Sequence, residues 1–132
     1  VGLEALRLRP QLRLWALEQR GGSAALIRAN AERLGVEPAG VVEGRAPEAL
    51  APLPDPDRVL LGGGGRGRLA LLQAVLPRLR PGGVVVVPLA TVEALAELRP
   101  ALEQAGLRVA VSQLQAWRGA PLANGTRRAR FT

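Results

Sequence analysis

Seven residues in the middle of the chain, LGGGGRG at 61–67, provide backbone with almost no side chains. They follow a short apolar run and precede a leucine-rich segment, and Gly62, Gly64 and Gly67 satisfy the pattern G-x-G-x-x-G. Glycine accepts positive φ and lets a ligand approach the main chain, so a dinucleotide loop and a phosphate loop are the first interpretations. Both fail. The acid that a dinucleotide loop needs about 20 residues later is missing, and a phosphate loop needs lysine, which the chain lacks.

The residue types that are absent exclude several chemistries. Without histidine or cysteine, Ser-His-Asp and Cys-His nucleophile systems and the usual zinc sites cannot be built, so we expect no metal site. An enzyme with this composition acts through arginines, a few carboxylates, backbone dipoles and a cofactor with its own reactivity. All 18 positive residues are arginine, and the net charge of +7 attracts polyanions, either nucleic acid or a small molecule with several carboxylates. Aromatic residues make up 2%, too few for the stacking platforms of single-strand binders, so a nucleic-acid partner is not expected.

Strands and helices must alternate to position these groups. Continuous apolar runs predict buried strands, and segments bounded by capping residues predict helices, with Ser23 as an N-cap, Gly35 as a stop and Pro100 as a kink. The expected strands are 12–17, 40–44, 57–62 and 82–88, and the expected helices are 24–34, 69–79 and 92–105, with one helical turn at 46–50. Two alternating runs at 107–117 and 126–131 predict an antiparallel pair.

This order of elements predicts an α/β fold with a parallel sheet covered on both faces. The length of 132 residues suits a single domain, residues 1–132. No apolar run reaches the roughly 20 residues of a membrane span, and no leader marks secretion, so we expect a cytoplasmic protein with no membrane partner.

Three consecutive strands deliver candidate binding residues to one edge of this sheet. Glu18 ends the first expected strand, Gly44-Arg45-Ala46 follows the second, and Gly62-Gly63 ends the third. Open α/β sheets bind ligands at the carboxyl ends of their strands, where an acid holds a ribose hydroxyl. The three segments together predict a nucleotide-like cofactor at this edge.

The chain resembles the class I S-adenosylmethionine-dependent methyltransferases, and most closely the precorrin-6B C15-methyltransferase (decarboxylating) family of cobalamin biosynthesis. The resemblance covers nearly the whole chain and is carried by WALEQRGGSAALIRANAERLGV, VVEGRAPEALAPLPDPDRVLLGGGG, LRPGGVVVVPLATVEAL and VSQLQAWRGAPLANGTRRAR. It implies a Rossmann-like sheet, mostly parallel with an antiparallel C-terminal hairpin. It also implies an enzyme that methylates C15 of an anionic tetrapyrrole, a precorrin, and removes the carboxyl group of an acetate side chain.

The resemblance also implies roles for individual residues. S-adenosyl-L-methionine is the implied cofactor, and its binding residues would be Glu18, Gln19, Gly44, Arg45, Ala46, Gly62 and Gly63. The implied substrate-binding residues are Gly64, Gly65, Arg66 and Arg118, and no individual catalytic residue is assigned. A homo-oligomer, by family resemblance a tetramer, is expected.

The chain departs from the family pattern in three places. Arg45 stands where the family commonly has an acid, and Pro88 stands where it has asparagine, a polar contact that Thr91 would supply. Residues 1–10 resemble the helix that follows the family's first strand and its glycine-rich loop, so we expect both upstream of Val1. In the family's fold this strand is central, so its two neighbours would otherwise have unpaired edges. Two alternatives stay open: a tRNA or other RNA methyltransferase of the same fold, and a non-catalytic methyltransferase-like domain.

Overall fold

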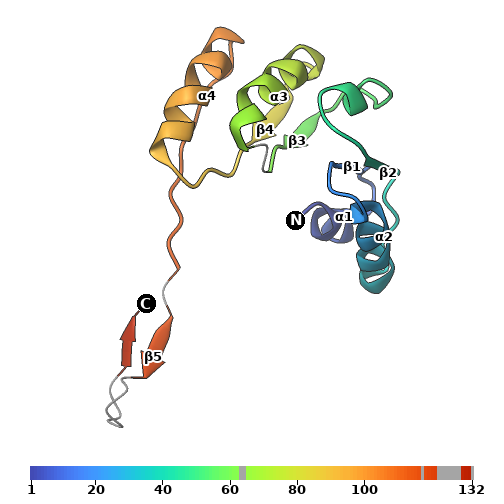
Figure 1. Cartoon of the computed structure of the whole chain (residues 1–132), viewed down its shortest axis with the longest axis horizontal. Helices are drawn as coiled ribbons and strands as arrows, with labels where there is room; N and C mark the ends of the chain where they lie inside the picture. Colours follow the sequence, from blue (N-terminus) through green and yellow to red (C-terminus); the bar gives the residue numbers. More distant parts are fainter. Residues whose placement is uncertain (63–64, 117, 122–128, 132) are drawn as a thin grey trace.

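Helices and parallel strands alternate along the chain (Figure 1). The computed structural model describes residues 1–62, 65–116, 118–121 and 129–131. The helices are α1 (Gly2–Leu8), α2 (Ser23–Leu34), α3 (Arg68–Val75) and α4 (Val92–Gln104), with the 3-10 turns η1 (Glu48–Leu50), η2 (Gly65–Gly67) and η3 (Leu76–Arg78). The strands are β1 (Trp15–Glu18), β2 (Gly40–Glu43), β3 (Arg58–Leu60), β4 (Val84–Val86), β5 (Gly119–Pro121) and β6 (Ala129–Phe131). The α/β class predicted from the sequence is confirmed.

The strands form separate pairs. β1 lies parallel to β2, and β3 lies parallel to β4, with α2 and α3 as the helices of the two crossovers. β5 and β6 form an antiparallel pair. The predicted parallel pairing is present, but in the described residues no strand pairing joins the β1–β2 pair to the β3–β4 pair. One face of the second pair, with Leu60, Val84 and Val86, also stays exposed.

The register of the first pair depends on one glycine. Trp15 lies opposite Gly40, and a Cβ at Gly40 would stand 2.3 Å from the Trp15 ring. No real side chain accepts that distance, so the indole occupies the space that a residue other than glycine would need. This contact fixes the start of both strands and brings Glu18 level with Glu43 at their carboxyl ends.

The second helix ends as expected but begins differently. Gly35 is its C-cap at φ 64°, the left-handed conformation that favours glycine. The prediction of Ser23 as N-cap is wrong, because Ser23 is the first helical residue and Gly22, at φ 81°, precedes it. The missing cap is replaced from a distance, since Oε2 of Glu43 accepts a hydrogen bond from Ala24 N at 3.1 Å.

The fourth helix begins with an ordinary cap and contains the proline. Thr91 Oγ1 accepts a hydrogen bond from Ala94 N at 3.2 Å, as an N-cap side chain does. Pro100 lies inside the helix and does not end it, although it has no N–H to donate to the preceding turn. The cap therefore fixes the start of α4 directly after the β4 connection.

The buried side chains form two small clusters. Leu6 and Ala31 are buried where α1 packs on α2, and this cluster belongs to the β1–β2 half of the chain. The other cluster lies under α3 and α4, which pack together beside β3 and β4 (Figure 1). Its members are Leu61, Leu72, Val75 and Leu98. Each strand pair therefore has a core of its own.

The C-terminal arm consists of residues 107–116 and the β5–β6 hairpin, and Figure 1 shows the hairpin set apart from the helices. The antiparallel pairing predicted for this region is confirmed, but its first strand is misplaced. Residues 107–116 form no strand, and the first strand is β5. Alternation alone does not make a strand without a neighbour to pair with. None of the helices in the described part of the chain combines the length and apolar composition needed to cross a bilayer.

Candidate functional site

Two carboxylates lie side by side at the carboxyl end of the β1–β2 pair. Glu18 is half-buried, and its Oε1 accepts a hydrogen bond from Gln19 N at 3.0 Å. Its partner across the pair, Glu43, instead caps α2 through Ala24. The bond of Glu18 goes to the adjacent residue, so this carboxylate does not tie one element to another. It lies where a parallel pair presents a group to a ligand.

The segment after β2 is a tightly folded turn. Gly44 N donates to Glu18 O at 3.0 Å, which continues the pairing of the two strands by one residue. The chain then folds back, since Ala49 N donates to Arg45 O at 2.9 Å. A Cβ at Gly44 would stand 2.9 Å from Cβ of Ala49, so this turn closes only around glycine. Arg45 is exposed and Ala46 is half-buried beside it.

The carboxyl end of β3 presents backbone instead of side chains. Leu61 is buried and extends the pairing through a hydrogen bond from its N to Val86 O at 2.9 Å. Gly62 follows it, exposed, and an added Cβ would meet nothing within 4 Å. Gly65 has φ 48°, so this position favours glycine. The predicted residues Gly63 and Gly64 and the Arg66 side chain lie outside the described part of the chain.

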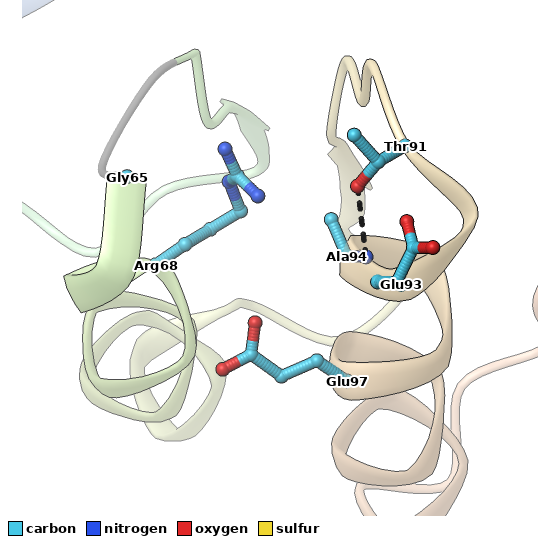
Figure 2. Close-up of a pocket in the computed structure, with 6 residues that line it drawn as sticks. All are labelled: Gly65, Arg68, Thr91, Glu93, Ala94 and Glu97. Carbon is cyan, nitrogen blue, oxygen red and sulfur yellow. Dashed lines mark hydrogen bonds between the residues drawn. The ribbon is translucent and has the colours of Figure 1, made fainter.

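A cleft opens between the first turns of α3 and α4 (Figure 2). Its volume is about 570 Å³, and it is lined by Gly65, Arg68, Thr91, Glu93, Ala94 and Glu97. The Arg68 guanidinium and the Glu97 carboxylate extend into it from opposite helices (Figure 2). The cleft borders the glycine loop through Gly65, so a ligand in it would lie next to the backbone that follows β3.

The cleft contains three charged residues that the sequence analysis did not assign. Arg68 offers a planar set of donors that suits a carboxylate, and both helices direct the positive ends of their dipoles to this side. Glu93 and Glu97 are four residues apart and therefore share one face of α4. The signal in the sequence was the position of Arg68 at the first turn after the glycine loop. The cleft can hold a ligand that carries both an anionic group and hydrogen-bond donors.

The structure brings together some of the predicted site residues and leaves others apart. Glu18 and Gln19 share the carboxyl end of the first strand pair with the turn 44–46. Gly62 and Gly65 lie at the end of β3. Arg118 does not join either group within one chain, because it directly precedes β5 in the hairpin that stands apart (Figure 1).

Comparisons with known proteins agree with one another. The family model described as a precorrin methyltransferase domain matches residues 1–129. A probable cobalt-precorrin-6B C(15)-methyltransferase (decarboxylating) of Pyrobaculum calidifontis is 36% identical over 121 residues, which is 91% of this chain and 58% of that protein. The chain thus spans less than two thirds of the length of this curated relative.

Solved structures show the same likeness. The crystal structure of precorrin-6y C5,15-methyltransferase from Geobacter metallireducens has a TM-score of 0.83 and 33% identity, over 98% of this chain and 67% of the other. The precorrin 8w decarboxylase of Methanobacterium thermoautotrophicum has a TM-score of 0.79 and 28% identity, over 97% of this chain and 68% of the other.

Proposed function

The chain belongs to the precorrin methyltransferase domain family, and from that premise we propose that it is part of an S-adenosyl-L-methionine-dependent enzyme. The proposed reaction methylates C15 of a precorrin and removes the carboxyl group of an acetate side chain, as the names of its relatives indicate for them. Two observations together carry the proposal: β1 ends in a half-buried carboxylate, Glu18, and the backbone after β3 is exposed at Gly62.

The described residues fit the proposed cofactor. Glu18 would accept hydrogen bonds from the ribose hydroxyls, with the bond from Gln19 N keeping the carboxylate at the strand end. The turn at Gly44, Arg45 and Ala46 would flank the adenine through backbone and apolar contact, because Gly44 closes it against Ala49. The open space at Gly62 leaves room for the methionine portion to pass along the main chain.

The cofactor, when bound, supplies an electrophilic methyl group on a sulfonium. The residues of this chain then have to hold a flat, anionic substrate against it. The glycine loop would let the macrocycle approach the backbone. Gly63 would contact the cofactor, and the substrate would be contacted by Gly64, Gly65 and Arg66. In the cleft, Arg68 would pair with a substrate carboxylate, and the hydroxyl of Thr91 would donate to the same group.

We infer a further strand between the two parallel pairs of the whole protein. β1 pairs only with β2 and β3 only with β4, so in the described residues each has an edge whose N–H and C=O groups have no strand partner. Unpaired strand edges take up another strand readily. A strand placed between β1 and β3 would join the pairs into one Rossmann-like sheet and align their carboxyl ends under a single cofactor.

We also propose a homo-oligomer built on the C-terminal arm. Val111 and Leu114 are 58% and 94% exposed, and an isolated two-stranded hairpin is marginal in water. A second copy of the chain covering the arm would bury these side chains. Arg118 stands apart from the site of its own chain, so its contact with substrate would be made in the site of another copy. A tetramer is the expected size.

The direct test uses the full-length protein. Calorimetry should show S-adenosylhomocysteine binding, and incubation with S-adenosylmethionine and a precorrin should give a product that has gained a methyl group and lost carbon dioxide. A transfer RNA mixture serves as the alternative acceptor, and its binding should fall steeply with salt if the basic charge serves RNA. Methylation of RNA and not precorrin would overturn the proposal, and failure to bind S-adenosylhomocysteine would favour a non-catalytic domain.

A further inference from the structure

Arg78 joins the end of the α3 segment to the segment that precedes β3. It lies in η3, at the end of the α3 segment, and all its described partners lie between residues 50 and 55. Nε donates to Asp55 Oδ1 at 3.0 Å, Nη1 donates to Leu50 O at 2.5 Å, and Nη2 donates to Leu53 O. The Arg78 side chain is 25% exposed, whereas that of Arg80, two residues later, is 55% exposed.

A series of backbone hydrogen bonds leads from Arg78 to the turn after β2. Leu50, whose carbonyl Arg78 binds, donates its own N–H to Pro47 O at 3.0 Å. The residue before it, Ala49, donates to Arg45 O at 2.9 Å. The 3-10 turn η1 is therefore held at one end by Arg78 and folds back at the other end onto the residues proposed to flank the adenine.

In the described residues, other contacts hold the end of the link to β3 and not the turn itself, since Arg80 N donates to Pro56 O at 3.0 Å. In the described residues no strand hydrogen bonds cross between the two parallel pairs, and each pair has its own buried cluster. The segment 44–57 is the covalent link between them, and Arg78 pins the middle of that link to the α3 side. The three hydrogen bonds of Arg78 have a fixed geometry, because the donors of a guanidinium lie in one plane. The single ammonium of lysine cannot reach three acceptors in that arrangement.

We propose that Arg78 is a positioning residue for cofactor binding, which sets the adenine-flanking turn at the correct distance from the glycine loop. The proposal rests on the proposed function, because it assumes that one cofactor contacts both strand pairs. Arg78 would not touch the cofactor. It would act through η1, and its loss should weaken cofactor binding in protein that is still folded.

The test compares Arg78→Gln and Arg78→Lys with Arg80→Gln in the full-length protein. Arg80 is the matched control, because its Nη1 also pairs with an aspartate of the same segment, Asp57, at 3.6 Å, but it binds no carbonyl of the η1 region. Calorimetry with S-adenosylhomocysteine, well below the melting temperature of each variant, should give a Kd raised at least tenfold for both Arg78 variants. Arg80→Gln should stay within twofold of the unmodified protein.

Three outcomes separate the possibilities. A lower melting temperature with an unchanged Kd for Arg78→Lys would overturn the proposal and leave Arg78 a purely structural residue. If both Arg78 variants fail to fold, Asp55→Ala decides, because it removes the carboxylate that aligns the guanidinium with the two carbonyls. An unchanged Kd with this variant would equally overturn the proposal, whereas a rise of threefold or more would support it. Absence of S-adenosylhomocysteine binding in the unmodified protein would refute the proposed function itself.

Discussion

The two parallel strand pairs share one topology, but their carboxyl ends are built in opposite ways. The β1–β2 pair ends in two carboxylates, Glu18 and Glu43. The β3–β4 pair leads to glycines, with open space at Gly62 and a positive φ at Gly65. One end offers charged acceptors, and the other offers bare main chain. The proposed cofactor has hydroxyl groups that need acceptors and a methyl group that must reach a second molecule. The β1–β2 end would therefore hold the cofactor, and the β3–β4 end would leave its methyl group accessible to the substrate.

The two carboxylates of the first pair also differ from each other. Glu43 accepts a hydrogen bond from the N-terminus of α2, whereas the described hydrogen bond of the Glu18 carboxylate comes from its neighbour in sequence, Gln19. Identical residues in register therefore differ in what they contact: Glu43 caps a helix, and Glu18 is the one proposed to bind the cofactor. Position within the pair does not distinguish them, but their hydrogen-bond partners do.

Replacing Glu18 should have the largest effect. Glu18→Ala should weaken S-adenosylmethionine binding by about 1.5–3 kcal/mol, the cost of losing hydrogen bonds to a charged group. The melting temperature should hardly change, since the carboxylate holds no other element. Calorimetry on the full-length protein measures the affinity, and a thermal scan measures the melting temperature. Unchanged affinity would remove Glu18 from the site and with it the contrast between the two strand pairs.

Adding one carbon at the glycine end should have the next largest effect. Gly62→Ala has space for its methyl group and no positive φ, so the fold should tolerate it. Methyl transfer should nevertheless fall at least tenfold, about 1.4 kcal/mol of transition-state stabilisation, because the added group separates the backbone from its ligands. Gly65→Ala is the matched comparison. Its φ of 48° predicts a loss of stability of roughly 1–2 kcal/mol. A fully active Gly62→Ala enzyme would show that this end serves only as a turn.

Removing the second carboxylate should affect stability and leave binding intact. Glu43→Ala takes away the side chain that accepts from Ala24 N, and loss of a helix cap costs about 1 kcal/mol. The melting temperature should fall by roughly 2–8 °C, while the affinity for S-adenosylhomocysteine should change less than twofold. A large loss of affinity would mean that the two carboxylates act together, and the distinction drawn between them would be wrong.

The smallest effect is expected at the cleft. Arg68→Gln should raise the KM for precorrin three- to fivefold, about 0.7–1 kcal/mol, and leave the KM for the cofactor unchanged. Arg99→Gln is the control, because Arg99 pairs with Glu103 on α4 at 2.7 Å and does not line the cleft. Steady-state kinetics with each substrate varied in turn gives both constants. Equal changes in both would place Arg68 outside the substrate region.

Local signals predicted most of the elements. The apolar runs located all four parallel strands. Gly35 marked the end of α2, because glycine accepts the left-handed conformation found there. Glu18 and Gly62 could be placed at one end of their strands because each follows an apolar run whose end is visible in the sequence. Whether these residues bind the cofactor and substrate stays a prediction.

Contacts between distant residues were not predicted. Glu43 caps a helix 19 residues earlier in the sequence, and Arg78 binds carbonyls 25 and 28 residues away, so no local pattern announces either. The alternating run at 107–117 is predicted as a strand, but residues 107–116 form none, because pairing depends on a partner that the sequence does not identify. The exposed face of the β3–β4 pair was not predicted, because apolar strands predict burial without stating which neighbour covers them.

The two separate buried clusters have a consequence for how the chain unfolds. Leu6 with Ala31 and the Leu72–Leu98 cluster share no strand pairing across the described residues, so each half can open without exposing the core of the other. Amide exchange in this chain should accordingly show two cooperative units with different opening free energies. A ligand that contacts both halves binds only when both are closed and so stabilises them together. With the cofactor bound, the two halves would therefore unfold as one cooperative unit.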